Sequence, residues 1–159
     1  MIHHGTHAYF ILHRDLVYRE HAWFVKTDAP QVRDEDCRKG NIRCLHFYAY
    51  SLLLNNFKTT GTKITTPYED GMVATREIPL VIANLQRADK RLSKCAEQEG
   101  FVEYCKDTEL PDTIIEKLVL PYIRYWKFMV HQLQNNISEL ADFFKEAEKE
   151  HKNIGILGI

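Results

Sequence analysis

Apolar residues recur at alternating steps of three and four along the C-terminal part of the chain. They are Ile123, Trp126, Val130, Leu133, Ile137, Leu140, Phe144 and Ala147. Residues three and four apart lie on one face of an α-helix, so the pattern predicts a continuous helix from about Tyr122 to about Glu150. Because one helix cannot shield so long a stripe, it should pack against other helices of the chain or against a partner.

Two earlier segments show the same helical repeat. In residues 36–56 the repeat positions are Ile42, Leu45, Ala49 and Leu52. Most residues between them are also apolar, which predicts a helix buried on most sides. In the other segment the positions are Val81, Leu85, Ala88, Leu92 and Cys95. That helix should begin at Thr75 or Pro79 and end at Glu99, where Gly100 is the stop signal.

The remaining C-terminal half contains one short helix and a tail. Leu110-Pro111-Asp112 supplies an N-cap for a helix that Pro121 should kink or break before the long helix begins. Residues 59–67 are rich in turn-forming and β-branched types and predict a loop with at most one short strand. The tail from Asn153 to Ile159 holds two glycines and is expected either to fray or to dock in a groove.

The N-terminal 35 residues fit two descriptions. Ala8–Leu12 and Ala22–Val25 are rich in strand-favouring residues and predict a β-hairpin. The alternative is a helix with Leu12, Leu16, Trp23 and Phe24 on one face. Taken together, the patterns predict one mainly α domain over residues 1–159, a four- or five-helix bundle with a possible small N-terminal β-hairpin in residues 1–35.

Composition narrows the class of protein. A chain of 159 residues with 45% hydrophobic content fits one globular domain with a real core. The net charge of -1 argues against a general polyanion binder. No apolar run approaches the roughly 18 residues of a membrane span, and the first apolar run is shorter than a signal-peptide core. A cytoplasmic protein is therefore expected, or a secreted one if a leader has been removed.

Cysteine and histidine residues give little support to a metal site. Cys37, Cys44, Cys95 and Cys105 would permit two disulfides, but no CxxC pair occurs. Cys37 and Cys44 would lie about 10 Å apart on a shared helix, too far for a bridge. Reduced thiols are therefore expected. His3, His4 and His7 could ligate a metal, but a flexible N-terminus explains them as well, so neither a metal nor another cofactor is expected.

One helix face carries a cluster of basic residues, the basic ridge. It consists of Arg87, Lys90, Arg91 and Lys94. Their spacing of i, i+3, i+4 and i+7 puts them on one side of the predicted second helix, opposite its apolar stripe. Four such charges could bind an anion or nucleic-acid phosphates, although the same pattern is typical of an ordinary solvated face.

Arg124 and His131 lie seven residues apart on the predicted long helix. This spacing resembles the Arg-x(4 to 6)-His element of the HEPN ribonucleases, an all-α family. The resemblance covers these two residues only. It implies an RNA-cleaving reading in which Arg124 and His131 are the catalytic pair of a helical dimer.

Aromatic residues widen the apolar face of the long helix beyond its stripe. Core packing and an interface both explain this width, since aromatic residues dominate both. The residues assigned to an interaction surface are Trp126, Met129, Phe143 and Phe144. The main expectation is a non-enzymatic protein–protein interaction module, with a homodimer as one form. The alternatives are a nucleic-acid-binding or RNA-cleaving helical protein and a cytokine-like secreted bundle with two disulfides.

Overall fold

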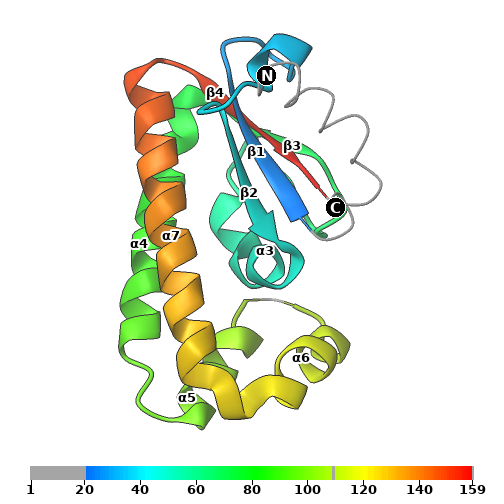
Figure 1. Ribbon diagram of the computed structural model, residues 1–159, viewed down its shortest axis with the longest axis vertical. Coiled ribbons are helices and arrows are strands. Elements are labelled where there is room, and N and C mark those ends of the chain that lie inside the picture. Colours follow the sequence, from blue (N-terminus) through cyan, green and yellow to red (C-terminus); the bar gives the residue numbers. More distant parts are fainter. Residues whose placement is uncertain (1–20, 109, 159) are drawn as a thin grey trace.

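The computed structural model describes residues 21–108 and 110–158 and shows a mixed α/β fold (Figure 1). The strands are β1 (His21–Thr27), β2 (Ile42–His46), β3 (Gly71–Val73) and β4 (Asn153–Leu157). The α-helices are α3 (Phe47–Leu53), α4 (Ile78–Ser93), α5 (Gln98–Lys106), α6 (Asp112–Leu118) and α7 (Trp126–Lys149). The 3-10 helices are η1 (Asp34–Asp36), η2 (Leu54–Phe57), η3 (Thr75–Glu77) and η4 (Leu120–Tyr125).

The strands form one antiparallel sheet in the order β2-β1-β4-β3. The expected mainly α bundle is therefore wrong, because a four-stranded sheet forms one side of the core. The C-terminal tail also differs from its expected fraying or groove docking. It is β4, which pairs with β1 on one side and β3 on the other, and its Ile154 and Ile156 are fully buried.

Close packing explains why a glycine lies within this central strand. An added Cβ on Gly155 would lie 2.2 Å from Cγ2 of Val32. Only the absence of a side chain lets the segment after β1 approach β4 so closely.

The strand character predicted for Ala22–Val25 is confirmed, since these residues lie in β1, and the helical alternative is wrong for them. The partners of β1 are β2 and β4, with Phe24 opposite Arg43 and Ile156. The proposed hairpin partner, Ala8–Leu12, lies outside the described residues. The β1 pairing thus joins segments that are distant in the sequence.

The single buried helix predicted over residues 36–56 is wrong. The segment contains η1, then β2, and only then α3 and η2. Pairing of Ile42–His46 with β1 overrides the helical repeat there. His46 ends the strand in extended backbone and its Nδ1 accepts a hydrogen bond from the Tyr48 N–H, so it caps the start of α3.

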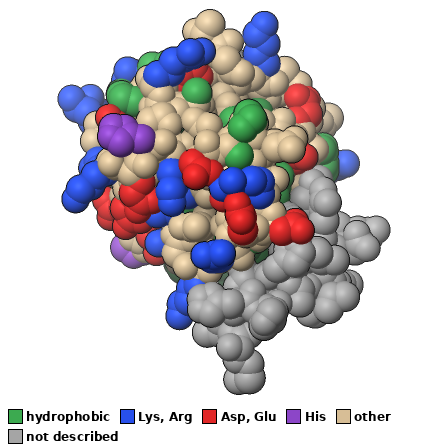
Figure 2. Space-filling model, turned by 90° about the horizontal axis from the view of Figure 1, so that it is seen from above, with side chains coloured by type: hydrophobic (Ala, Val, Ile, Leu, Met, Phe, Trp, Pro, Cys, Tyr) green, Lys and Arg blue, Asp and Glu red, His purple; other side chains and the backbone are tan. Residues whose placement is uncertain are grey.

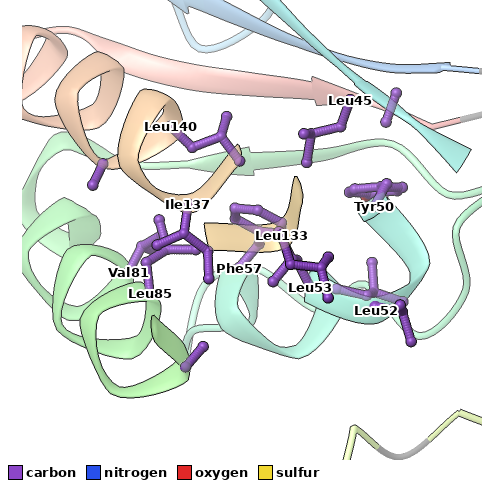
Figure 3. Packing of buried hydrophobic residues seen from close by; sticks show 14 of the residues in the cluster. Leu45, Tyr50, Leu52, Leu53, Phe57, Val81, Leu85, Leu133, Ile137 and Leu140 are labelled. Atoms are coloured by element: carbon purple, nitrogen blue, oxygen red, sulfur yellow. The ribbon is translucent and has the colours of Figure 1, made fainter. Parts of the chain in front are cut away.

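Helices α4 and α7 lie side by side and antiparallel along the length of the molecule (Figure 1). The predicted stripe of α4 is confirmed from Val81 to Leu92, whereas Cys95 lies past the end of that helix, and the stripe of α7 is confirmed from Val130 to Ala147. Val81 and Leu85 of α4 face Ile137 of α7 within the buried cluster (Figure 3). The predicted start of the long helix is wrong, because residues 120–125 form η4 and Ile123 is only half-buried. The break expected at Pro121 is confirmed, as α6 ends before it.

Helix α4 ends six residues earlier than Glu99, the predicted end. The amides of Lys94 and Cys95 bond to carbonyls three residues back, which closes the helix in a tight turn. Gly100 does not stop α4 but lies within α5. The loop predicted over residues 59–67 is confirmed.

An aromatic cluster fills the space between the sheet and the helices. Phe24 of β1 contacts Tyr50, Phe57 and Phe144, with ring centroids 5.0 to 6.2 Å apart. Phe57 and Leu53 lie next to Leu133 of α7 (Figure 3). This cluster holds α3 against α7 and so fixes the geometry of the site between them.

Two buried charged residues tie the sheet to its surroundings. Lys26 of β1 is 4% exposed, and its Nζ lies 3.3 Å from Glu146 on α7 and 3.4 Å from Glu150, which directly follows α7. Asp36 accepts hydrogen bonds from the hydroxyl of Thr27 at 2.6 Å and the backbone N–H of Arg33 at 2.8 Å. Both sets of contacts link segments of the fold and require no ligand to be satisfied.

Candidate functional site

A groove of about 670 Å³ lies between α3 and the η4–α7 segment, and we call it the aromatic groove. The residues that line it are His46, Tyr48, Ala49, Leu52, Tyr122, Tyr125, Phe128, Met129, Gln132, Leu133 and Asn136. Apolar and aromatic side chains dominate this set, and the only polar amides are those of Gln132 and Asn136. Pockets of this size and composition are typical binding sites.

The α3 wall begins where β2 ends. His46, the capping residue, stacks on Tyr48 with ring centroids 5.0 Å apart and planes 24° apart. Leu52 lies four residues after Tyr48 and three after Ala49, so its side chain is next to both on the side of α3 that lines the groove. The small side chain of Ala49 projects only a short way into the groove.

The opposite wall follows from the break at Pro121. Because η4 is a 3-10 helix, residues three apart lie directly above one another, and Tyr122 and Tyr125 line up along the groove. Phe128 continues this row into α7. The three rings are 50%, 50% and 63% exposed.

The floor of the groove is part of the core, whereas its rim is open to solvent. Leu52 and Leu133 are each 3% exposed, and Tyr48 on the rim is 41% exposed. Large aromatic side chains that gather around an apolar hollow are unusual on the surface of a monomer and mark interaction sites. The rim therefore carries apolar area that a bound partner could cover.

The four residues of the predicted interaction surface lie in two different environments. Met129 lines the groove, and Trp126 is half-buried against the core beside it. Phe143 and Phe144 do not belong to any surface: they are 1% and 0% exposed. Phe144 stacks on Phe57, so both side chains are core residues of α7.

The basic ridge divides into two parts. Lys90 and Lys94 are exposed and line neither this groove nor the second hollow described next. Arg87 and Arg91 border a hollow of about 270 Å³ with Asn55, Asn56 and Asn84 among its other lining residues. Arg91 forms an ion pair of 2.6 Å with Asp107, and Arg87 donates to Asn84. An acidic residue within this hollow opposes the binding of an anion.

Arg124 and His131 do not lie on one continuous α-helix. Arg124 belongs to η4, and its guanidinium lies 4.7 Å from the centre of the Tyr125 ring. His131 is exposed on α7. The regular two-turn spacing on which the resemblance to the HEPN element rests is therefore interrupted by the change of helix type.

The four cysteines have free thiols. Burial raises the pKa of the Cys37 thiol to about 11 and that of Cys105 to about 12, which keeps both protonated and unreactive. Within residues 21–108 and 110–158, no group of three or more His, Cys, Asp or Glu side chains could hold a metal ion. His3, His4 and His7 lie outside the described residues.

Sequence reasoning missed most of the aromatic groove. Tyr122, Tyr125 and Phe128 belong to the aromatic residues that widen the apolar face of the predicted long helix, but they were not among the residues assigned to the interaction surface. Tyr48 was not considered for a surface, and His46 was placed in a buried helix. The available signal was the row of aromatic residues at steps of three that begins directly after Pro121. A step of three without a four matches a 3-10 turn and departs from the stripe of α7.

The chain was compared with known proteins in three ways. No protein-family model matches it, and no curated protein or solved structure is significantly similar to it. In the part of the chain that the structure describes, no helix has the length and apolar character needed to cross a membrane.

Proposed function

We propose that this protein is a non-enzymatic interaction module that binds a protein partner in the aromatic groove. The observation that carries the proposal is the row of exposed rings, Tyr122, Tyr125 and Phe128, beside an apolar floor. Tyrosine, phenylalanine and methionine are enriched where protein interfaces are fully buried, and such residues contribute most of the binding energy.

The shape of the groove favours a helical segment as the bound element. Its lining runs along η4 and α7 from Tyr122 to Asn136, which corresponds to about 20 Å at 1.5 Å per residue. Both walls are helices whose backbone groups are bonded internally, and β2 contributes only its last residue, His46. A strand would find no free backbone edge there, whereas a helix can insert apolar side chains.

Site-specific photo-crosslinking tests this proposal. A benzoylphenylalanine replaces Phe128 in the groove, and in a matched control it replaces Leu80, which is 46% exposed on α4 and does not line the groove. In the cells that produce the protein, we expect a discrete protein adduct from position 128 and none from position 80. An absence of protein adducts at position 128, or equal adducts at both positions, would refute the proposal.

A further inference from the structure

Both walls of the aromatic groove come from segments that contain basic but no acidic residues. Residues 37–68 include five Lys or Arg and no Asp or Glu, and residues 117–138 include three Lys or Arg and no Asp or Glu. The rest of the chain holds all 22 acidic residues and the other 13 basic ones. The fold brings the two basic segments together, since α3 lies in the first and η4 and the start of α7 lie in the second.

Arg124 lies at the rim of the groove. Its guanidinium is 4.7 Å from the centre of the Tyr125 ring, which lines the groove. Lys127 does not border the groove, because it lies on the opposite side of α7 with its ammonium 5.7 Å from the ring of Trp126. The first acidic residue after Arg124 is Glu139, three positions past Asn136 at the end of the groove. On the face of the molecule seen from above, by contrast, basic and acidic side chains are intermixed (Figure 2).

We propose that the occupant of the aromatic groove is an amphipathic helix of a partner protein whose polar face is acidic. The apolar floor takes the anchors of that helix, and Arg124 faces its carboxylates. Complementary charge at a rim steers the encounter and selects against partners of like charge. This inference rests on the proposed function and specifies the chemistry of the partner.

A second copy of the chain does not match this description within residues 21–108 and 110–158. The acidic residues of α7, such as Glu139 and Asp142, lie on a helix whose apolar stripe is already buried against α4 and the sheet. The stripe of α5 is likewise buried through Phe101 and Tyr104. Neither helix has a free apolar face to place in the groove of another copy.

Two synthetic helical peptides of about 16 residues provide the test, a length that covers the groove. They share one apolar face of Leu and Phe at i, i+3, i+4 and i+7 and carry either Glu or Lys on the polar face. Binding to the purified protein is measured by fluorescence anisotropy between about 50 and about 500 mM salt, because screening weakens rim interactions. A labelled single-stranded oligouridylate serves as a third probe.

We expect the Glu peptide to bind about fivefold more tightly than the Lys peptide at low salt, since an exposed charge contributes up to about 1 kcal/mol. The variant Arg124→Glu should remove this preference. The control Lys90→Glu changes the net charge equally on an exposed residue away from the groove and should retain the preference. Phe128→Ser should weaken both peptides, whereas Leu80→Ser should weaken neither.

Each contrary result has a distinct meaning. Equal or tighter binding of the Lys peptide that still depends on Phe128 overturns the acidic partner but leaves the interaction module intact. No binding of either peptide, or binding that Phe128→Ser does not weaken, overturns the interaction module as well. Binding of the oligouridylate that depends on Phe128, without binding of the Glu peptide, replaces the protein partner with single-stranded nucleic acid, for which exposed rings also provide stacking surfaces.

Discussion

Replacement of Gly155 by alanine tests the placement of the C-terminal tail at the centre of the sheet. The new Cβ would lie 2.2 Å from Cγ2 of Val32 and 3.6 Å from Cε of Met72. Carbon atoms pack at about 3.5 to 4.0 Å, so the contact with Val32 is too short by more than 1 Å and the contact with Met72 is acceptable. The branched Cβ of valine restricts its χ1 rotation, so the side chain cannot easily turn away.

The magnitude follows from two opposing effects. Overpacking of this kind costs about 1 to 3 kcal/mol. Alanine also restricts the unfolded chain, which stabilises by about 0.4 to 1 kcal/mol where the backbone is compatible, as it is in this strand. We therefore expect Gly155→Ala to lower the free energy of unfolding by about 1 to 2 kcal/mol, or the melting temperature by roughly 2 to 8 °C for a domain of this size.

A double-mutant cycle with Val32→Ala isolates the contact, because alanine at position 32 lacks the clashing Cγ2. In that background Gly155→Ala should be neutral or slightly stabilising, which gives a coupling free energy of about 1 to 3 kcal/mol. Urea unfolding followed by circular dichroism measures all four proteins through their midpoints and m-values.

Gly100→Ala is the matched control for the substitution itself. Gly100 lies in α5, where the nearest atom to an added Cβ is 3.8 Å away, so this change should stabilise the protein by about 0.5 to 1 kcal/mol. If Gly155→Ala costs the same with and without Val32, or stabilises as Gly100→Ala does, then the tail is not packed under Val32 as a central strand.

Two further predictions concern titratable groups. Burial alone would raise the pKa of Asp36, but hydrogen bonds from Arg33 and Thr27 hold that pKa below its usual value. The ionised Asp36 carboxylate therefore stabilises the fold above about pH 4, and this stabilisation is lost as the pH falls through the lowered folded-state pKa. Asp36→Asn should lower the free energy of unfolding by about 1 to 3 kcal/mol at pH 7. In a series of urea unfolding midpoints measured at different pH values, this variant should show a smaller loss of stability in acid. In the folded protein at pH 8, a chromogenic disulfide reagent should label exposed Cys44 and half-exposed Cys95, with Cys37 and Cys105 reacting only on unfolding; one common rate for all four would contradict their burial.

Helical periodicity predicted those elements whose stripes are covered by another helix. The repeats of α4 and α7 can be recognised without knowing which helix each packs against, because each helix forms its own hydrogen bonds and its apolar face is visible from spacing alone. The same reasoning failed for residues 42–46. Ile42 and Leu45 fit a helix equally well, and only pairing with β1 decides in favour of a strand.

The central strand β4 was the hardest element to predict from the sequence. Its five residues, Asn153–Leu157, include a glycine, and glycine usually weakens a strand. The strand is stabilised by ladders to β1 on one side and β3 on the other, both more than 75 residues away in the chain. Such non-local pairing leaves no periodic signal in so short a segment, and so the mixed α/β class could not be recognised.

The aromatic groove results from the same kind of long-range assembly. Its two walls are separated by about 70 residues, and each wall alone resembles an ordinary amphipathic helix with a few exposed rings. The absence of acidic residues is visible in each segment of the sequence, yet it has no functional meaning until the fold puts the segments opposite each other. Under the proposal, Arg124 beside an apolar floor that no acidic side chain lines then favours a partner of opposite charge.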